Sequence, residues 1–221
     1  MSAIYLSWPI SDDTPGYGGK SNITISPISS ISEGDTANSK HYDIWNHIGT
    51  HIDFPNHFFD NGKTIDNYSA EFWIFNKPFV LEVPCEIGRW IEWSDGFETV
   101  PIDTDLLIVK SGFCEKRDEQ VYWEDNPGLA PEVGEMLREK RSSIRAVAMD
   151  FISVSRWQDR ETGRKSHRAF LDPDGKGDPI LLIEDADLRD VNGDTAIKRV
   201  TALPLIVIGT DGSQITIVAE T

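Results

Sequence analysis

The chain has 221 residues, of which 39% are hydrophobic, and its seven Trp and ten Phe residues are enough for the core of a single domain spanning residues 1–221. The net charge of −16 argues against nucleic acid and anionic membranes as partners, because phosphate contacts need clustered Lys and Arg. No stretch approaches the roughly 20 apolar residues of a membrane span and the N-terminus lacks a basic start, so we expect a cytoplasmic protein.

Short apolar runs rich in β-branched residues dominate the chain. They are bounded by Gly, Pro, Asp or Asn, which is the pattern of strands separated by turns. Strands are therefore predicted at residues 79–83, 106–110, 144–151, 180–183, 203–208 and 215–219. The pair Asp211-Gly212 is a hairpin signal between the last two of these strands.

Helices are expected to be few. The clearest is predicted at residues 131–141, where Pro131 suits the first turn and apolar residues recur at helical spacing. A second helix is predicted to begin near Asp185. Many short strands with few helices indicate a β-rich α/β or α+β fold in which loops carry the chemistry.

Four of the five histidines lie between His41 and His57. The run His47-Ile-Gly-Thr-His51-Ile-Asp53-Phe-Pro-Asn-His57 interleaves three of them with an acid, and imidazole plus carboxylate is a ligand mixture that zinc, manganese and iron accept. These four side chains would share one face of an extended chain, but its ends would lie roughly 33 Å apart. A shared metal therefore requires the chain to bend, and Gly49 and Pro55 are the residues that permit it.

Two other interpretations of this run are weaker. His47 and His51 have the i, i+4 spacing of a helix, but Gly49 and Pro55 disfavour a helix there. A zinc protease of the zincin type needs Glu directly after the first histidine, where this chain has Ile48. His41 lies outside the run and is interpreted as a structural residue.

Two distant residues are further candidate ligands. His167 is the only histidine outside the cluster, and Glu184 ends the apolar run 180–183. A charged residue at the end of a buried strand is costly unless it is paired or binds a cation, so Glu184 is a candidate metal ligand. The alternative is that Glu184 caps the helix predicted near Asp185, and the spacing alone does not separate the two.

The histidine run resembles the signature of the cyclase family of metal-dependent hydrolases, which includes bacterial kynurenine formamidases and isatin hydrolases. Further stretches look like family blocks in the expected order, so the resemblance covers nearly the whole chain. They lie at residues 105–112, 126–132, 146–153, 167–184 and 203–205.

The resemblance implies a site for one or two divalent metals per chain, Zn²⁺ or Mn²⁺. His47, His51 and Asp53 would hold one metal. Asp53 and Glu184 would bridge to a second metal, and His167 would complete that second site.

The resemblance also implies a catalytic role for His57, as proton donor and acceptor. The family's fold is a swivelling β/β/α domain, which agrees with the strand-rich pattern. Its members assemble into dimers or larger oligomers, so a homodimer or homotetramer is expected here.

The chain departs from the formamidase pattern near its N-terminus. Where the formamidases have Trp-Pro-Gly-Asp, this chain has Thr14-Pro15-Gly16-Tyr17, so the tryptophan that lines the formamidase pocket is missing. Tyr17 and Trp8 are the candidates to replace it. The difference argues against N-formylkynurenine as the substrate.

The ligand types predict hydrolysis of a small amide, lactam or related ring by a metal-activated water. A divalent metal lowers the pKa of bound water towards ~7, and an imidazole such as His57 can take a proton from water and return it to a leaving amine. No Gly-x-Ser-x-Gly motif suggests a serine nucleophile. Cys85 and Cys114 lack Cys-x-x-Cys spacing and are predicted to be core thiols.

Two alternatives from other classes remain open. Non-haem iron oxygenases bind iron through two histidines and one carboxylate, and this ligand set is matched here by His51, Asp53 and His167. A non-catalytic metal-binding module would explain the altered N-terminal stretch.

Overall fold

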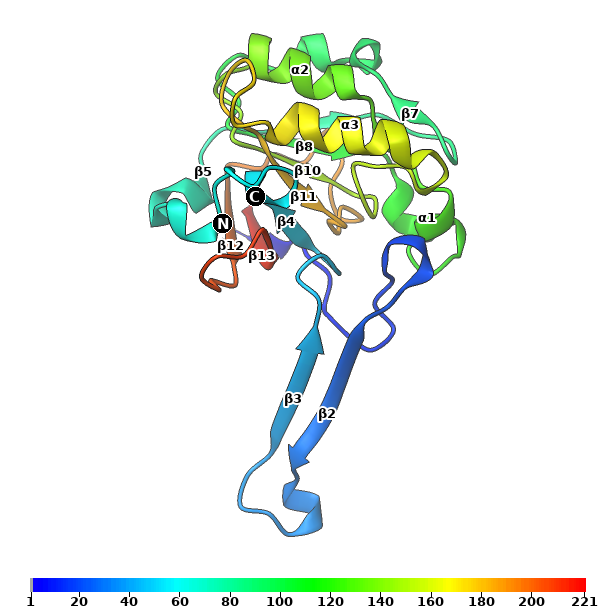
Figure 1. Ribbon diagram of the computed structural model, residues 1–221, viewed down its shortest axis with the longest axis vertical. Helices are drawn as coiled ribbons and strands as arrows, with labels where there is room; N and C mark the ends of the chain where they lie inside the picture. Colours follow the sequence, from blue (N-terminus) through cyan, green and yellow to red (C-terminus); the bar gives the residue numbers. More distant parts are fainter. Residues whose placement is uncertain (1) are drawn as a thin grey trace.

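The computed structural model describes residues 2–221 and is built around a mixed sheet of nine strands (Figure 1). The strand order is β5-β12-β13-β4-β11-β10-β8-β6, and β1 pairs with the far end of β13. These strands are β1 (Ala3–Tyr5), β4 (His51–Asp53), β5 (Ile74–Phe75), β6 (Pro78–Glu82), β8 (Leu106–Lys110), β10 (Ala146–Met149), β11 (Leu181–Glu184), β12 (Arg199–Pro204) and β13 (Gly212–Glu220). The α/β class predicted from the sequence is confirmed.

Four strands of the sheet, β6, β8, β10 and β11, run parallel to one another. All residues of β10 and β11 are buried, as are the first four of β8, which explains why these strands read as continuous apolar runs rather than as alternating patterns. The strand predicted at 106–110 is confirmed, and those predicted at 79–83 and 180–183 differ from β6 and β11 by one residue at each end. The run 144–151 contains β10.

The longest helices pack against each other over this parallel part of the sheet (Figure 1). They are α2 (Pro131–Lys140), which confirms the predicted helix, and α3 (Arg160–Leu171), which was not predicted from the sequence. A Cβ on Gly134 would lie 2.8 Å from the Phe170 ring, so glycine permits the close approach of the two helices. Asp159 caps α3 by accepting a hydrogen bond from the Thr162 amide.

The other helical segments are short. They are α1 (Val121–Glu124) and the 3₁₀ turns Tyr17–Gly19, Ile31–Glu33, Pro55–His57, Ile65–Asn67, Ala70–Trp73, Trp93–Asp95, Phe97–Thr99, Phe113–Lys116 and Trp157–Asp159. No helix within residues 2–221 has the length and apolarity needed to cross a bilayer.

Two predicted elements are wrong. The strand predicted at 203–208 ends at Pro204, because β12 pairs with β13 only over Arg199–Pro204 and the next residues form an exposed loop. The helix predicted near Asp185 is absent. Asp185 has a left-handed φ of 53°, and its buried carboxylate is bound by Arg117 and Tyr122, which turns the chain away from the end of β11.

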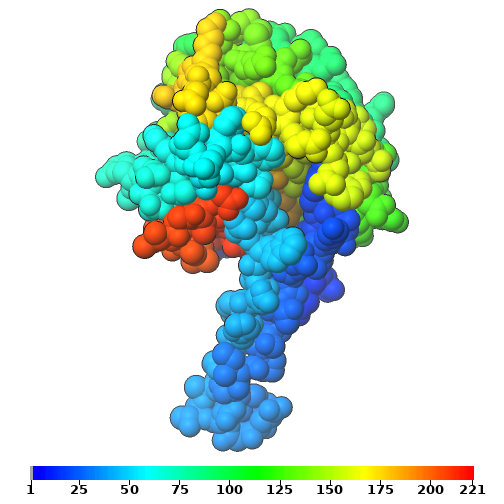
Figure 2. All heavy atoms as spheres, viewed as in Figure 1, coloured from blue at the N-terminus to red at the C-terminus, as the bar shows by residue number. Residues whose placement is uncertain are grey.

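A two-stranded ribbon projects from the body of the protein (Figures 1 and 2). It consists of β2 (Ile23–Ser29) and β3 (Ser39–Ile44), paired antiparallel, and its tip is residues 30–38. A further small parallel pair joins β7 (Trp90–Ile91) to β9 (Gly128–Leu129). Neither pair was predicted from the sequence.

Candidate metal centre

The histidine run bends where the sequence predicts. Gly49 has a φ of 66°, which few other residues tolerate, and Pro55 begins a 3₁₀ turn that ends at His57. Between the bends, His51–Asp53 forms strand β4. His51 and Asp53 therefore share one face of the strand, and Ile52 points from the other face into the core.

Strand register places Glu184 beside this segment. β4 runs antiparallel to β11, and His51 lies directly opposite Glu184 in the ladder. Nε2 of His51 is 3.5 Å from Oε2 of Glu184 and 3.5 Å from Oδ1 of Asp53. Because the predicted helix at Asp185 does not exist, Glu184 has no helix to cap, and the alternative interpretation of this residue is wrong.

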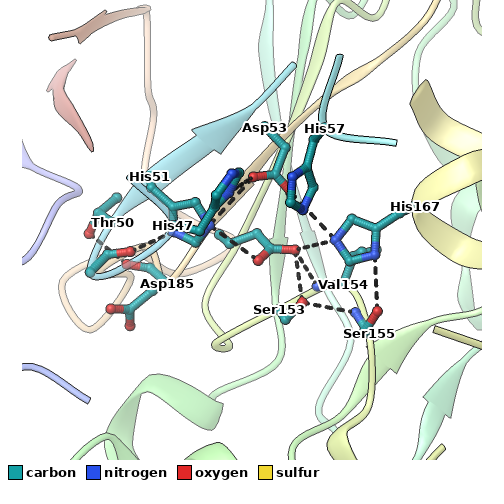
Figure 3. Close-up of polar contacts among 12 residues, drawn as sticks. His47, Thr50, His51, Asp53, His57, Ser153, Val154, Ser155, His167 and Asp185 are labelled. Atoms are coloured by element: carbon teal, nitrogen blue, oxygen red, sulfur yellow. Dashed lines mark hydrogen bonds and ion pairs between the residues drawn. The ribbon is translucent and has the colours of Figure 1, made fainter. Parts of the chain in front are cut away.

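Helix α3 brings His167 to the opposite side of the same two carboxylates (Figure 3). Nε2 of His167 is 3.5 Å from Oδ2 of Asp53 and 3.5 Å from Oε1 of Glu184. Each carboxylate thus turns one oxygen towards His51 and the other towards His167. Asp53 and Glu184 therefore both lie between the two imidazoles, and each carboxylate faces both rings.

The other ring nitrogens of these two histidines are already engaged. Nδ1 of His51 donates to the Gly49 carbonyl at 2.8 Å, and Nδ1 of His167 lies 3.1 Å from the Gly163 carbonyl and 3.0 Å from the Ser155 hydroxyl. In a neutral imidazole this leaves the Nε2 lone pair of each ring facing the carboxylates. Metal-binding histidines show this arrangement, with the second nitrogen fixed by a carbonyl or carboxylate.

Two observations show that the donor set fits a divalent cation. Oδ2 of Asp53 is buried and has no hydrogen-bond partner within residues 2–221, although a buried carboxylate oxygen is normally satisfied. Ligand atoms of His47, His51 and Asp53 all lie within 4.8 Å of one another, and so do those of Asp53, His57 and His167. Imidazole and carboxylate donors of this kind suit Zn²⁺ and Mn²⁺.

The hydrogen bonds of Glu184 hold its carboxylate in place. Its Oε1 accepts from the Val154 amide at 2.7 Å and from the Ser153 hydroxyl at 3.1 Å. Next to it, Thr50 donates to the carbonyl of Asp185 at 2.6 Å, which ties the histidine run to the end of β11.

A third carboxylate, Asp211, joins the cluster and was missed from the sequence. Its Oδ2 accepts from Nε2 of His47 at 2.9 Å and from Nδ1 of His57 at 2.8 Å. The Asp211-Gly212 pair was explained as a hairpin signal, so nothing in its spacing marked the acid as part of a site. Gly212 also leaves room for the imidazole of His47, because a Cβ at this position would lie 2.3 Å from the His47 ring.

The charges of the cluster shift the pKa values of its members. Burial lowers the pKa of His47, but Asp53 and Asp211 outweigh burial and raise it to about 10. Burial likewise opposes protonation of His167, whereas its contacts with Asp53 and Glu184 raise the pKa to about 9. Burial raises the pKa of Asp53, yet His47 and His57 hold it well below its usual range. In the metal-free protein, protons on the imidazoles supply the positive charge that a cation would bring.

The cluster lines one wall of a cavity of about 310 Å³. Tyr17 and Phe58 supply aromatic surface to this cavity, and Arg160 and Arg164 supply positive charge. Of the two aromatic candidates for the missing tryptophan, Tyr17 is in the cavity. Trp8 does not line this cavity, and its ring instead contacts the guanidinium groups of Arg117 and Arg189.

The structure therefore brings all six predicted site residues together: His47, His51, Asp53, His57, His167 and Glu184. His41 is exposed on β3, in agreement with its exclusion from the site. Cys114 is buried, whereas Cys85 is only partly buried.

Comparisons with known proteins agree with this architecture. A family model described as "Putative cyclase" matches residues 4–156. The chain is 26% identical over 215 residues to a kynurenine formamidase of Bacillus cereus, covering 96% of this chain and 94% of that protein. It is 25% identical over 207 residues to cyclase-like protein 2 of Arabidopsis thaliana, with 84% of this chain matched but only 66% of the plant protein's length.

Among solved structures, isatin hydrolase A from Labrenzia aggregata superposes with a TM-score of 0.82 over 99% of this chain and 93% of that chain. The sequence identity is 19%, so this likeness concerns the fold. The family match covers more than half of the chain and includes the complete histidine run. The chain belongs to the cyclase family.

Proposed function

We propose that this protein is a metal-dependent hydrolase that cleaves a carbon–nitrogen bond in a small amide, lactam or related cyclic substrate. The observation that carries the proposal is the pair of carboxylates, Asp53 and Glu184, each lying 3.5 Å from both His51 and His167. The curated relative named kynurenine formamidase and the structural neighbour named isatin hydrolase support this reaction class.

The residues that would hold a cation are the carboxylates of Asp53 and Glu184 and the imidazoles that face them. His47, His51 and Asp53 are proposed to hold one Zn²⁺ or Mn²⁺ ion, and Asp53, Glu184 and His167 a second. A divalent cation in this position supplies a water of lowered pKa, near ~7, and polarises a carbonyl oxygen.

His57 is proposed to be the proton donor and acceptor. Asp211 accepts from its Nδ1 at 2.8 Å, which fixes the ring and leaves Nε2 as the nitrogen that can exchange a proton. His57 lines the cavity, so a substrate held there is within its reach. During hydrolysis His57 would take the proton released by the attacking water and return it to the departing nitrogen as the carbon–nitrogen bond breaks.

An iron oxygenase is the less favoured alternative. Such enzymes use two histidines and one carboxylate and keep the remaining positions open. His51, Asp53 and His167 do come together here, but Glu184 lies as close to both imidazoles as Asp53 does. With Glu184 as a second carboxylate beside both imidazoles, the donor set fits a hydrolytic site better than a three-residue site with open coordination positions.

A non-catalytic metal-binding module is also less favoured. The cluster forms the wall of a cavity large enough for a small molecule, and His57 faces that cavity. A purely structural cation site would have no need of either feature.

The decisive experiment joins metal content to turnover. The purified protein is analysed for bound metals and then assayed, before and after chelation and after adding back Zn²⁺, Mn²⁺ or Fe²⁺. The substrates are N-formylkynurenine, isatin and simple lactams, with and without oxygen. We expect anaerobic hydrolysis that chelation abolishes and Zn²⁺ or Mn²⁺ restores. Oxygen consumption that depends on Fe²⁺ would instead establish the oxygenase, and bound metal with no turnover of any substrate would favour the module.

A further inference from the structure

Helix α3 carries two arginines towards the same cavity as His167. Arg160 and Arg164 both line the cavity, and together with His167 they are spaced i, i+4 and i+7 along the helix. Residues at this spacing share one helix face. The three side chains therefore form a row along one face of α3, and His167 at the end of this row belongs to the metal cluster.

Neither guanidinium group has an acidic partner among residues 2–221. Neither Arg160 nor Arg164 forms an ion pair or a side-chain hydrogen bond within the part of the chain that the structure describes, although the chain has 37 acidic residues. Lys165, between them on the same helix, pairs with Glu161 at 2.9 Å. In so acidic a chain, two unpaired arginines at a cavity are available for an anion from outside.

The surroundings of Arg160 indicate what the anion is attached to. Its guanidinium lies 5.0 Å from the Trp157 ring centroid, and Trp157 in turn makes an edge-to-face contact of 5.1 Å with Tyr17. Tyr17 and Phe58 form aromatic parts of the cavity wall. A planar ring can lie along this wall with its reacting bond at the metal cluster and an anionic group at the arginines.

We propose that Arg160 and Arg164 form a carboxylate-binding subsite, so that the substrate is an aromatic or cyclic amide bearing a carboxylate remote from the scissile bond. This inference rests on the proposed hydrolase function. Guanidinium groups bind carboxylates through two parallel hydrogen bonds, and such charge-assisted pairs are stronger than neutral ones. The arginines act by positioning the substrate and not in bond cleavage.

The test compares two substrates that differ by one carboxylate, 4-formamidobenzoate and formanilide. The para position keeps the carboxylate away from the metal cluster. For the wild-type protein we expect a KM at least about tenfold lower for the acid. Arg160→Gln and Arg164→Gln should each raise the KM for 4-formamidobenzoate about tenfold and leave kcat and the kinetics with formanilide nearly unchanged. Lys165→Gln removes the same charge from the same helix and should change neither substrate's KM.

Equal KM values for the two substrates, or equal effects of Lys165→Gln and the arginine variants, would overturn the subsite. Direct binding of 4-methylbenzoate to the protein as isolated separates this outcome from a failure of the hydrolase proposal. If neither amide is cleaved but the Arg160→Gln/Arg164→Gln double variant binds 4-methylbenzoate at least tenfold more weakly than the wild type, the subsite stands and the reaction class is wrong. If 4-methylbenzoate binds equally well to the wild type and the double variant, the subsite is wrong.

Discussion

Oδ2 of Asp211 accepts a hydrogen bond from Nδ1 of His57 at 2.8 Å, although the two residues lie 154 positions apart in the sequence. The same oxygen is 2.9 Å from Nε2 of His47. One carboxylate, on the residue directly before β13, therefore orients both a candidate ligand and the candidate proton carrier. This relationship makes Asp211 a positioning residue for the metal centre.

Asp211→Asn should lower kcat/KM about 10- to 100-fold, because loss of a carboxylate that orients a ligand histidine commonly costs that much in activity or metal affinity. The change should also lower Zn²⁺ affinity and move the acidic limb of the pH–rate profile. A purely structural role would shift none of the pH dependence. Asp66→Asn is the matched control, since Asp66 accepts from the Gly209 amide in the same loop but contacts no histidine.

His51→Ala should abolish stoichiometric metal binding and reduce turnover to background. The variant removes the imidazole that faces both bridging carboxylates and leaves two buried acids without it. His41→Ala removes an exposed histidine of strand β3 and should leave metal content and activity at wild-type values. Full metal content and activity in His51→Ala would contradict the assignment of the site.

The metal-free protein should lose stability as pH rises from 7 to 10. The pKa of His47 is raised to about 10 and that of His167 to about 9, whereas an unfolded histidine titrates near ~6.5. The stabilisation from these protonated rings is complete below about pH 6.5 and disappears as pH passes through 9 to 10. We expect the free energy of unfolding in urea with chelator to fall by on the order of 1–3 kcal/mol over this range.

Adding Zn²⁺ should reverse this pH dependence, because a cation must displace the protons from the imidazoles and so binds more tightly at higher pH. Titrations at pH 6 and pH 8 should show the tighter binding at pH 8, with proton release. Zinc affinity that does not change with pH would show that His47 and His167 are not the protonated ligands.

Arg117→Met should destabilise the fold by about 3–5 kcal/mol, because it leaves the buried carboxylate of Asp185 without its cationic partner and with only the Tyr122 hydroxyl bound to it. The guanidinium donates three hydrogen bonds to the Asp185 carboxylate, of 2.9, 3.2 and 2.6 Å, and both side chains are largely buried. Lys116→Met removes the adjacent exposed charge, which pairs with Glu119 at 3.7 Å, and should cost less than about 1 kcal/mol. Thermal and urea unfolding of both variants measure the difference.

The hydrophobic pattern was sufficient to predict the parallel strands and helix α2. β8, β10 and β11 are buried along their whole length or nearly so, which makes them visible as apolar runs. Helix α3 was missed because its buried face is made largely of Gly163, Ser166 and His167, with only Phe170 and Leu171 as large apolar residues. The projecting ribbon of β2 and β3 was missed because none of its strand residues is buried, so it lacks the alternation of buried and exposed residues that marks a strand.

The composition and spacing of residues 47–57 by themselves determined that a metal site was expected and where its chain must bend, since ligand chemistry and the geometry of Gly49 and Pro55 are local properties. The sequence also made His167 and Glu184 candidate ligands, and the family resemblance assigned them to a second metal site. Only the tertiary structure decided how these groups meet. The antiparallel register of β4 with β11 places His51 opposite Glu184, and the packing of α3 places His167 on the other side of Asp53.

Asp211, Arg160 and Arg164 show the limit of reasoning from sequence. A single acid in a turn or two arginines in a polar segment have no distinctive spacing. Their meaning depends on which atoms lie within a few ångströms of them. That proximity comes from long-range strand pairing and helix packing, which bring residues more than 100 positions apart into contact.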